Sequence, residues 1–245
     1  MSYFIFGGSG FIGTHLIALI DNIYPGTKIY NLDIVKNNHE GKSTYINCDV
    51  RSEINIDISV TSEDVIFNFA AVHRTPGHPD QAYFETNIRG AENVCAFAEK
   101  FGIKKIVFTS SIAPYGAAED LKTEETLPTP NTPYGISKLV AEKIHTIWQA
   151  KKSNERQLTI VRPGVVFGKG ENGNFTRLYW GIRGGKFFYP GRKDTIKACI
   201  YVKELVRFML YRLENHNEGV ELYNCTYEPA FTIEQIVETM KKATG

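Results

Sequence analysis

The 245-residue sequence has little of what marks a secreted, metal-binding or nucleic-acid-binding protein. Its 28 lysines and arginines nearly balance 27 aspartates and glutamates, and the basic residues are scattered. No surface for nucleic acid or an anionic membrane is therefore expected. The four cysteines, Cys48, Cys95, Cys199 and Cys225, lack the paired spacing typical of zinc sites. We expect buried, reduced thiols, no metal site and a cytoplasmic location.

The sequence also lacks a long hydrophobic run. Its apolar N-terminus is interrupted by four glycines within the first thirteen residues and carries no basic leader or small-residue cleavage site. Neither an export signal nor a membrane span is therefore expected. The hydrophobic content of 42% nevertheless suffices for a sizeable core, as one large domain or one domain with a small appendage.

What the chain does have is a glycine-rich stretch at its start. Gly7, Gly10 and Gly13 lie between an apolar segment at 2–6, which predicts a buried strand, and a segment at 14–20, which predicts a helix. Glycines in this context allow a tight turn, bring backbone N–H groups close to a pyrophosphate and pack the helix closely on the strand. Ordinary turns also contain glycines three apart, so the loop alone does not decide between these interpretations.

A second predicted strand decides between a phosphate-binding loop and an ordinary turn. The segment at 28–33 ends in Asp33, about 20 residues after the last glycine, where a carboxylate can accept hydrogen bonds from both ribose hydroxyls. The two features together predict a mononucleotide-binding half.

Strands and helices then alternate. Asp80 is the expected N-cap of a helix through Lys100 that Gly102 ends, and a second helix is expected from Pro133 to about Lys151. Further predicted strands lie at 44–50, 64–71, 105–109 and 158–161. This alternation predicts a doubly wound parallel sheet covered on both faces. From residue 162 many glycines divide the sequence into short pieces, which predicts a smaller lobe over the carboxyl edge of the sheet.

Three segments at strand ends are further candidates for ligand contact. Asp49 ends the strand at 44–50 and could meet an adenine amino group, although a surface carboxylate is nearly as good an interpretation. Ala70 and Ala71 are small enough to let backbone approach a ligand. For the loop at 73–79, substrate contact and simple solvent exposure both remain open.

A catalytic group is predicted on the helix that begins at residue 133. Tyr134 and Lys138 are four residues apart and hence on one helix face, where an ammonium would lower the pKa of the phenol and make it a general base. Such a pair also occurs by chance. Ser111 follows the preceding strand and can hydrogen-bond the same substrate oxygen. The three residues together predict a hydride-transfer site.

With these residues the sequence resembles the extended short-chain dehydrogenases/reductases, the group that includes NAD-dependent nucleotide-sugar epimerases and dehydratases. The resemblance covers nearly the whole chain and extends to Asn87 and to the segments at 162–168 and 200–205. It implies a Rossmann domain at 1–165 that binds NAD and carries the catalytic triad. It implies a substrate lobe at 166–245 that returns partly to the core, and a homodimer through the helices around 81–101 and 133–150.

The resemblance assigns roles to individual residues. The implied catalytic residues are Ser111, Tyr134 and Lys138. The implied NAD-binding residues are Gly7, Gly10, Phe11, Ile12, Gly13, Asp33, Asp49, Val50, Ala70, Ala71, Asn87, Tyr134 and Lys138. Those implied for a nucleotide-sugar substrate are Ser111, Asn174 and Lys197. NAD is expected rather than NADP, because Asp33 would repel a 2′-phosphate and Lys36 alone lies nearby to compensate.

The chain departs from the family pattern in three places. Relatives usually run on beyond the expected helix at 232–242, so part of the substrate lobe is expected to be missing. Lys197 stands where many members have a diphosphate-binding arginine. Residues 112–114 are Ile-Ala-Pro, without the acids that dehydratases and sugar decarboxylases of the group carry there.

These departures favour one of three candidate functions over the other two. The leading interpretation is epimerisation at carbon 4 of a UDP-type sugar through a keto intermediate. A keto-sugar reductase or dehydrogenase of the same family is the alternative, and a non-catalytic NAD(P)-binding regulator is a third. His73 could supply the acid or base missing from 112–114.

Overall fold

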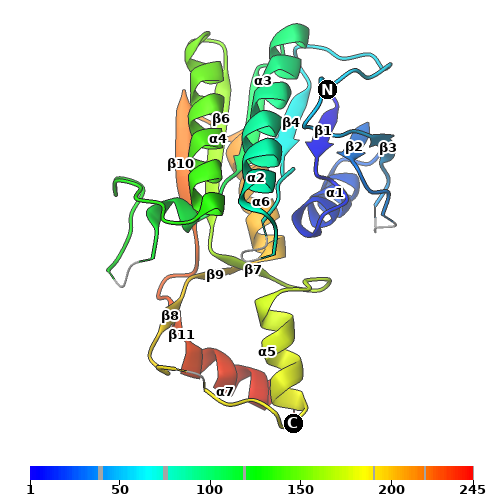
Figure 1. Cartoon of the computed structure of the whole chain (residues 1–245). Helices are drawn as coiled ribbons and strands as arrows, with labels where there is room; N and C mark the ends of the chain where they lie inside the picture. Colours follow the sequence, from blue (N-terminus) through cyan, green and yellow to red (C-terminus); the bar gives the residue numbers. More distant parts are fainter. Residues whose placement is uncertain (38–40, 74–76, 118–119, 190, 218, 245) are drawn as a thin grey trace.

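The computed structural model describes residues 1–37, 41–73, 77–117, 120–189, 191–217 and 219–244. Its centre is a seven-stranded sheet whose strands all pair in parallel, in the order β3-β2-β1-β4-β5-β6-β10 (Figure 1). The strands are β1 (Tyr3–Phe6), β2 (Ile29–Asp33), β3 (Thr44–Asn47), β4 (Val65–Asn68), β5 (Lys105–Thr109), β6 (Gln157–Pro163) and β10 (Val220–Cys225). The order reverses direction between β1 and β4, where doubly wound sheets open a ligand crevice. The predicted fold class is confirmed.

Helices cover both faces of this sheet. α1 (Phe11–Ile23) and α6 (Val202–Glu214) pack against each other on one face, and α3 (Arg89–Phe101) and α4 (Pro133–Ala150) on the other. β1 is buried along its whole length because its alternating side chains enter two different hydrophobic clusters. None of the helices in the described ranges is both long and apolar enough to cross a bilayer.

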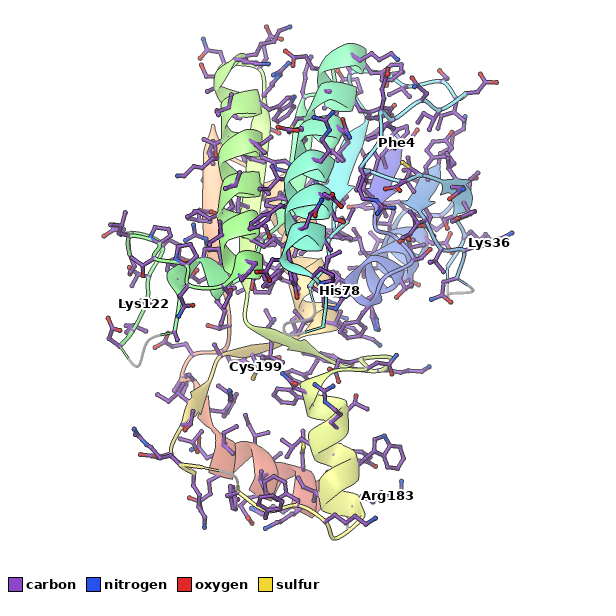
Figure 2. All side chains as sticks on the ribbon, viewed as in Figure 1. Phe4, Lys36, His78, Lys122, Arg183 and Cys199 are labelled. Atoms are coloured by element: carbon purple, nitrogen blue, oxygen red, sulfur yellow. The ribbon has the colours of Figure 1, made fainter. Side chains whose placement is uncertain are left out.

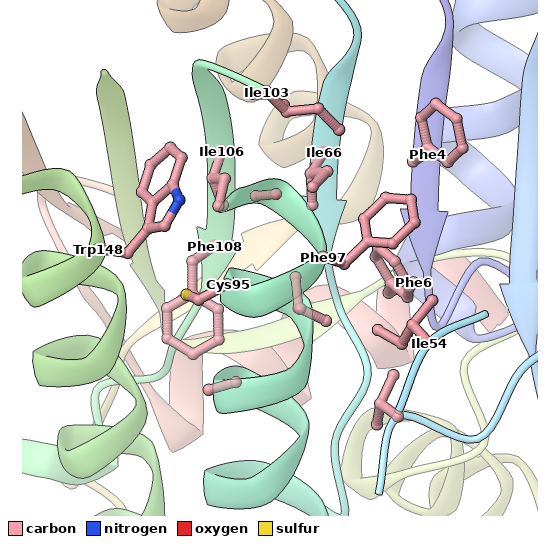
Figure 3. Packing of buried hydrophobic residues seen from close by; sticks show 14 of the residues in the cluster. Phe4, Phe6, Ile54, Ile66, Cys95, Phe97, Ile103, Ile106, Phe108 and Trp148 are labelled. Atoms are coloured by element: carbon pink, nitrogen blue, oxygen red, sulfur yellow. The ribbon is translucent and has the colours of Figure 1, made fainter. Parts of the chain in front are cut away.

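The cluster between the sheet and α3 is rich in aromatic rings. Phe97 of α3 lies 5.7 Å from Phe4 and 5.8 Å from Phe6, between ring centroids, and Figure 3 shows the three rings together. Trp148 of α4 packs at the other side of the same cluster. Rings at these separations add packing energy beyond the area they bury. The core thus fixes the strand ends that carry the site.

The helix predicted from Asp80 to Lys100 is interrupted. Pro79, not Asp80, holds the N-cap position of α2 (Asp80–Tyr83), so the prediction of an Asp80 cap is wrong. A π-helical turn, η1 (Phe84–Ile88), then separates α2 from α3. Such turns are frequent at functional sites, and this one buries Asn87. Gly102 ends α3 in a left-handed conformation, as predicted.

The start of α4 follows the prediction closely. Thr132 is the N-cap, its hydroxyl accepts the N–H of Gly135 at 3.0 Å, and Pro133 is the first helical residue. This start fixes Tyr134 in the first turn, below the carboxyl end of β5 and next to the short helix η2 (Ala113–Tyr115).

The lobe lies below the carboxyl ends of the strands (Figure 1). β7 (Val165–Phe167) pairs with β9 (Cys199–Tyr201), and Figure 2 shows Cys199 at this junction and Arg183 at the far end of the lobe. The lobe proper consists of α5 (Asn174–Arg183), β8 (Ile196–Lys197), β11 (Phe231–Thr232) and α7 (Ile233–Thr244). Between β9 and β11 the chain returns to the sheet as α6 and β10. A domain boundary at residue 165 stays a prediction.

Candidate active site

A cavity of about 1210 Å³ opens at the carboxyl ends of β1, β2, β4 and β5 and reaches the first residues of α5. Most residues predicted for the site lie on its wall: Gly7, Gly10, Phe11, Ile12, Gly13, Asp33, Asp49, Val50, Ala70, Ala71, Ser111, Tyr134, Lys138 and Asn174. The volume exceeds that of ordinary small-molecule pockets, which are about 300–1,000 Å³. It therefore has room for a dinucleotide beside a second ligand.

The glycine loop is built for close approach. Gly7 has φ +75°, and a Cβ there would lie 2.7 Å from the Ala70 nitrogen. A Cβ at Gly13 would lie 2.6 Å from the Gly8 Cα. Any side chain at either position would therefore push the loop off β4 or open the turn. The N-terminus of α1, which starts in this loop, lies on the cavity wall, where its N–H groups suit a pyrophosphate.

Asp33 is anchored beside this loop. Its carboxylate accepts the backbone N–H of Ser9 at 3.0 Å and that of Val35 at 3.1 Å. A carboxylate has about four acceptor sites, so two remain for ribose hydroxyls. Asp49, in contrast, is held by Arg51 at 2.6 Å, and the hydrogen bonds from Arg51 lower the pKa of its carboxyl. Both carboxylates line the cavity, and the residues present fit an adenosine dinucleotide.

Lys138 enters the site from the second turn of α4. It is buried, its Nζ donates to the Thr109 carbonyl at 2.7 Å, and it lies 4.9 Å from the centroid of the Phe108 ring. Burial lowers the pKa of Lys138 to about 8, and the charge of Glu142 opposes that shift. The Thr109 hydroxyl, also on the cavity wall, has no hydrogen-bond partner in the part of the chain that the structure describes.

The side chains of Ser111 and Tyr134 contact each other at the carboxyl end of β5. The Ser111 hydroxyl accepts the Ala113 N–H at 3.1 Å and hydrogen-bonds the Tyr134 hydroxyl. Burial raises the pKa of Tyr134, and the bond from Ser111 counteracts this only in part. The expectation that Lys138 lowers this pKa is wrong for this arrangement, because the ammonium is bound to the Thr109 carbonyl.

Two predicted residues lie off the cavity wall. The Asn87 side chain accepts the N–H of Val72 at 2.8 Å and donates to the Val72 carbonyl and the Ser137 hydroxyl, so it holds a strand end and α4 together. Lys197 is exposed on β8, opposite Phe231. Their direct contact with cofactor or substrate stays a prediction. Of the loop at 73–79, residues 74–76 lie outside the described ranges, while His73 lies on the wall.

Among the wall residues that sequence reasoning missed are His15, Lys169 and Arg177. His15 Nε2 lies 2.9 Å from the Lys169 carbonyl, which joins α1 to the loop before α5. Arg177 lies one turn into α5 and donates to the Asn174 side chain at 2.6 Å. The sequence does carry a signal for the two cations: Lys169 lies in a glycine-rich loop, and Arg177 lies in the first turn of the helix that follows.

Comparison with known proteins agrees with an NAD-binding enzyme of the doubly wound class. The model of the NAD dependent epimerase/dehydratase family matches residues 3–226. The chain belongs to this family, and NAD is the family's cofactor.

Several relatives are 4-epimerases. The chain is 36% identical over 98% of its length, and 71% of the relative's, to N-acetyl-alpha-D-glucosaminyl-diphospho-ditrans,octacis-undecaprenol 4-epimerase of Escherichia coli O157:H7. It is 27% identical to UDP-glucose 4-epimerase of Bacillus subtilis (strain 168), over 100% of this chain and 83% of the relative. The solved structure of MoeE5 in complex with UDP-glucuronic acid and NAD has the same fold, with a TM-score of 0.85 at 23% identity, over 100% of this chain and 83% of that one.

Proposed function

We propose that the protein epimerises carbon 4 of a sugar joined to a diphosphate, through a 4-keto intermediate. The observation that carries this proposal is the hydrogen-bonded pair of hydroxyls of Tyr134 and Ser111 at the carboxyl end of β5. The side chain of Lys138 lies one turn away on α4. The 4-epimerase relatives support the same reaction.

Each residue has a role in this reaction. The Tyr134 oxygen takes the proton of the C4 hydroxyl as the C–H bond breaks, and the Ser111 hydroxyl holds the same oxygen as it becomes a carbonyl. The hydrogen bond from Ser111 favours the phenolate form of Tyr134, and Lys138 would hold NAD beside it. NAD, held by the glycine loop and Asp33, would supply the hydride acceptor and donor that carbon 4 needs. Tyr134 gives the proton back to the oxygen, and because the hydride also returns to the sugar, the reaction is redox-neutral.

The distribution of acids on the cavity wall favours epimerisation over elimination or decarboxylation. Among the described wall residues the acids are Asp33, Asp49 and Glu171. The first two lie at the ends of β2 and β3, and Glu171 accepts the N–H of Thr176 in the lobe at 2.9 Å. None belongs to the segment at 112–114 beside Ser111, where a second acid or base would have to act.

The diphosphate has a candidate site of its own. Lys169 of the loop before α5 and Arg177 of α5 line the same cavity as the glycine loop. Cations there suit a substrate diphosphate, and a guanidinium suits it best because it can donate two hydrogen bonds at once. A diphosphate is shared by both carriers named in the relatives' activities, uridine and undecaprenol.

We propose a UDP-type sugar as substrate. The second candidate is a sugar on a polyprenyl diphosphate, which the 36% identical relative favours. The test supplies catalytic enzyme with UDP-glucose, UDP-N-acetylglucosamine and N-acetylglucosamine diphosphate on a short polyprenol, with no added cofactor. Anomeric NMR signals report epimerisation, and the absorbance of reduced nicotinamide reports redox turnover. In a parallel reaction with added reduced nicotinamide, its stoichiometric consumption would replace the epimerase with the reductase, and no turnover of any sugar in either reaction would favour the regulator.

We further propose that the protein forms a homodimer through α3 and α4, which pack side by side on one face of the sheet. The Ile147 side chain is 60% exposed on α4, where a partner subunit would bury it. Light scattering coupled to size exclusion measures the mass. We expect twice the chain mass for the native protein and a smaller mass for Ile147→Lys.

A further inference from the structure

A buried ion pair lies directly behind the candidate active site. Glu142 of α4 and Arg162 of β6 meet at 2.6 Å, with side chains only 4% and 3% exposed. The contact is bidentate, since Arg162 Nε donates to Glu142 Oε1 at 2.8 Å and Arg162 Nη2 donates to Oε2 at 2.6 Å. Apolar residues of similar volume often serve stability as well as such a pair does. Stability alone therefore does not account for these two charges at this place.

The ion pair is joined to the strand end that carries Ser111. The Ser110 hydroxyl donates to Glu142 Oε1 at 2.5 Å, and the Ser110 N–H donates to the Val161 carbonyl of β6 at 2.8 Å. The residue before Ser111 is thus held from both its backbone and its side chain. On the other side, the Arg162 guanidinium lies 4.7 Å from the centroid of the Tyr115 ring. A shift of the Glu142 side chain would therefore displace Ser110 and, with it, Ser111.

Glu142 also lies on the same face of α4 as Lys138. It is four residues after Lys138 on α4, a spacing that brings two side chains to the same helix face. The other groups around Lys138 are the Thr109 carbonyl and the Phe108 ring of β5, with Tyr134 and His145 on α4 itself. Burial lowers the pKa of His145 to about 4, so this ring is uncharged at neutral pH. Among the residues that the structure describes, Glu142 supplies the negative charge that acts on the buried ammonium.

We propose that Glu142, clamped by Arg162, is a positioning residue: it holds Ser110, and through it Ser111, in place, and its carboxylate stabilises the charge of the buried Lys138 side chain on the same face of α4. The catalytic half of this statement rests on the proposed function. The electrostatic half concerns the chain alone. The two halves are therefore tested by different measurements.

The first measurement is the pH profile of kcat for Glu142→Gln, which keeps the shape and removes the charge. Lys138 should then lose its proton at lower pH, so the alkaline limb of kcat should move at least one pH unit toward acid, with KM changed less than kcat. The matched control is Glu221→Gln, which removes the carboxylate of a second largely buried ion pair, with Arg212, between α6 and β10. That variant should lose stability without a shift of the limb. An unmoved limb in Glu142→Gln would overturn the electrostatic role.

The second measurement needs no turnover. Unfolding of the wild type, Glu142→Gln, Lys138→Met and the double variant is followed against pH in saturating NAD. A lysine whose folded pKa lies below its unfolded pKa makes the protein more stable as pH rises from the lower value to the higher. For Lys138 this window begins near pH 8. The rise in stability should begin at a lower pH in Glu142→Gln. It should be absent when Lys138 is replaced by Met, both in the wild type and in Glu142→Gln.

Equal pH curves for the wild type and Glu142→Gln would contradict the proposal even if the enzyme were an epimerase. A shifted window in a protein that turns over no sugar would instead keep Glu142 as the residue that charges Lys138 and reject the epimerase. Ser110→Ala tests the structural half and does not depend on the folding of Glu142→Gln. It leaves both charges in place, so kcat should fall several-fold with the alkaline limb unmoved. Wild-type kcat in Ser110→Ala would refute the positioning of Ser111.

Discussion

The sheet and the lobe meet at one cavity but are held together in different ways. β1, β4 and most of β5 are buried, and two hydrophobic clusters lie on the two faces of the sheet. In the lobe, no residue of α5 is buried, and Trp180 on this helix is 57% exposed. The groups that would perform chemistry lie on the packed side. The groups that would choose a substrate lie on the loosely packed side, where sequence change costs little stability.

The largest expected effect tests this contrast in stability. Phe4→Ala removes a fully buried ring from β1 and should lower the free energy of unfolding by about 3–5 kcal/mol. Trp180→Ala removes a larger side chain from α5 but should change it by less than about 1 kcal/mol, because most of the ring already faces solvent. Urea unfolding of both variants measures the two values. Equal losses would mean that the lobe is packed as tightly as the sheet.

The next effect concerns chemistry on the packed side. Tyr134→Phe should reduce kcat by about 10²-fold or more, since it removes the proton acceptor and leaves the ring in place. NAD binding and the melting temperature should stay close to those of the wild type. The control is Tyr179→Phe on α5, which loses the same hydroxyl away from the triad and should keep its activity. Full activity in Tyr134→Phe would remove this residue from the mechanism.

A smaller effect is expected at the adenosine end. Asp33→Ala removes a carboxylate that could bind ribose hydroxyls and should weaken NAD binding about tenfold or somewhat more, which corresponds to the lower end of the about 1.5–3 kcal/mol for a hydrogen bond to a charged group. NADP should lose less, because the negative charge that repels its 2′-phosphate is gone. Titration of both cofactors into the wild type and the variant measures this. Tighter binding of NADP than NAD to the wild type would contradict the assignment.

Local rules explain what the sequence could predict. The glycine loop, Asp33 and the start of α4 each depend on a few consecutive residues, such as Thr132 and Pro133, whose conformational preferences are strong. The doubly wound parallel sheet followed from the alternation of strands and helices.

What could not be predicted depends on distant contacts. The π-helical turn at 84–88 is one case, since Asn87 is held by Val72 and Ser137. The pKa of Tyr134 is another. The spacing to Lys138 was right, but the sequence does not reveal that the ammonium is bound to the Thr109 carbonyl instead. The Glu142–Arg162 pair joins residues on α4 and β6, and neither segment alone indicates it.

The smallest effect is expected on the lobe side of the cavity, at Arg177. This residue is exposed and its guanidinium already donates to Asn174, so its contact with a diphosphate is screened by solvent and is worth about 1 kcal/mol or somewhat less. Arg177→Ala should therefore raise KM for the sugar diphosphate about fivefold, with kcat and NAD affinity nearly unchanged. Arg183→Ala, at the far end of the same helix, is the matched control and should leave KM unchanged. A loss of NAD affinity in Arg177→Ala would instead place this cation at the cofactor's pyrophosphate, and the division between a chemical side and a substrate side would then fail at this residue.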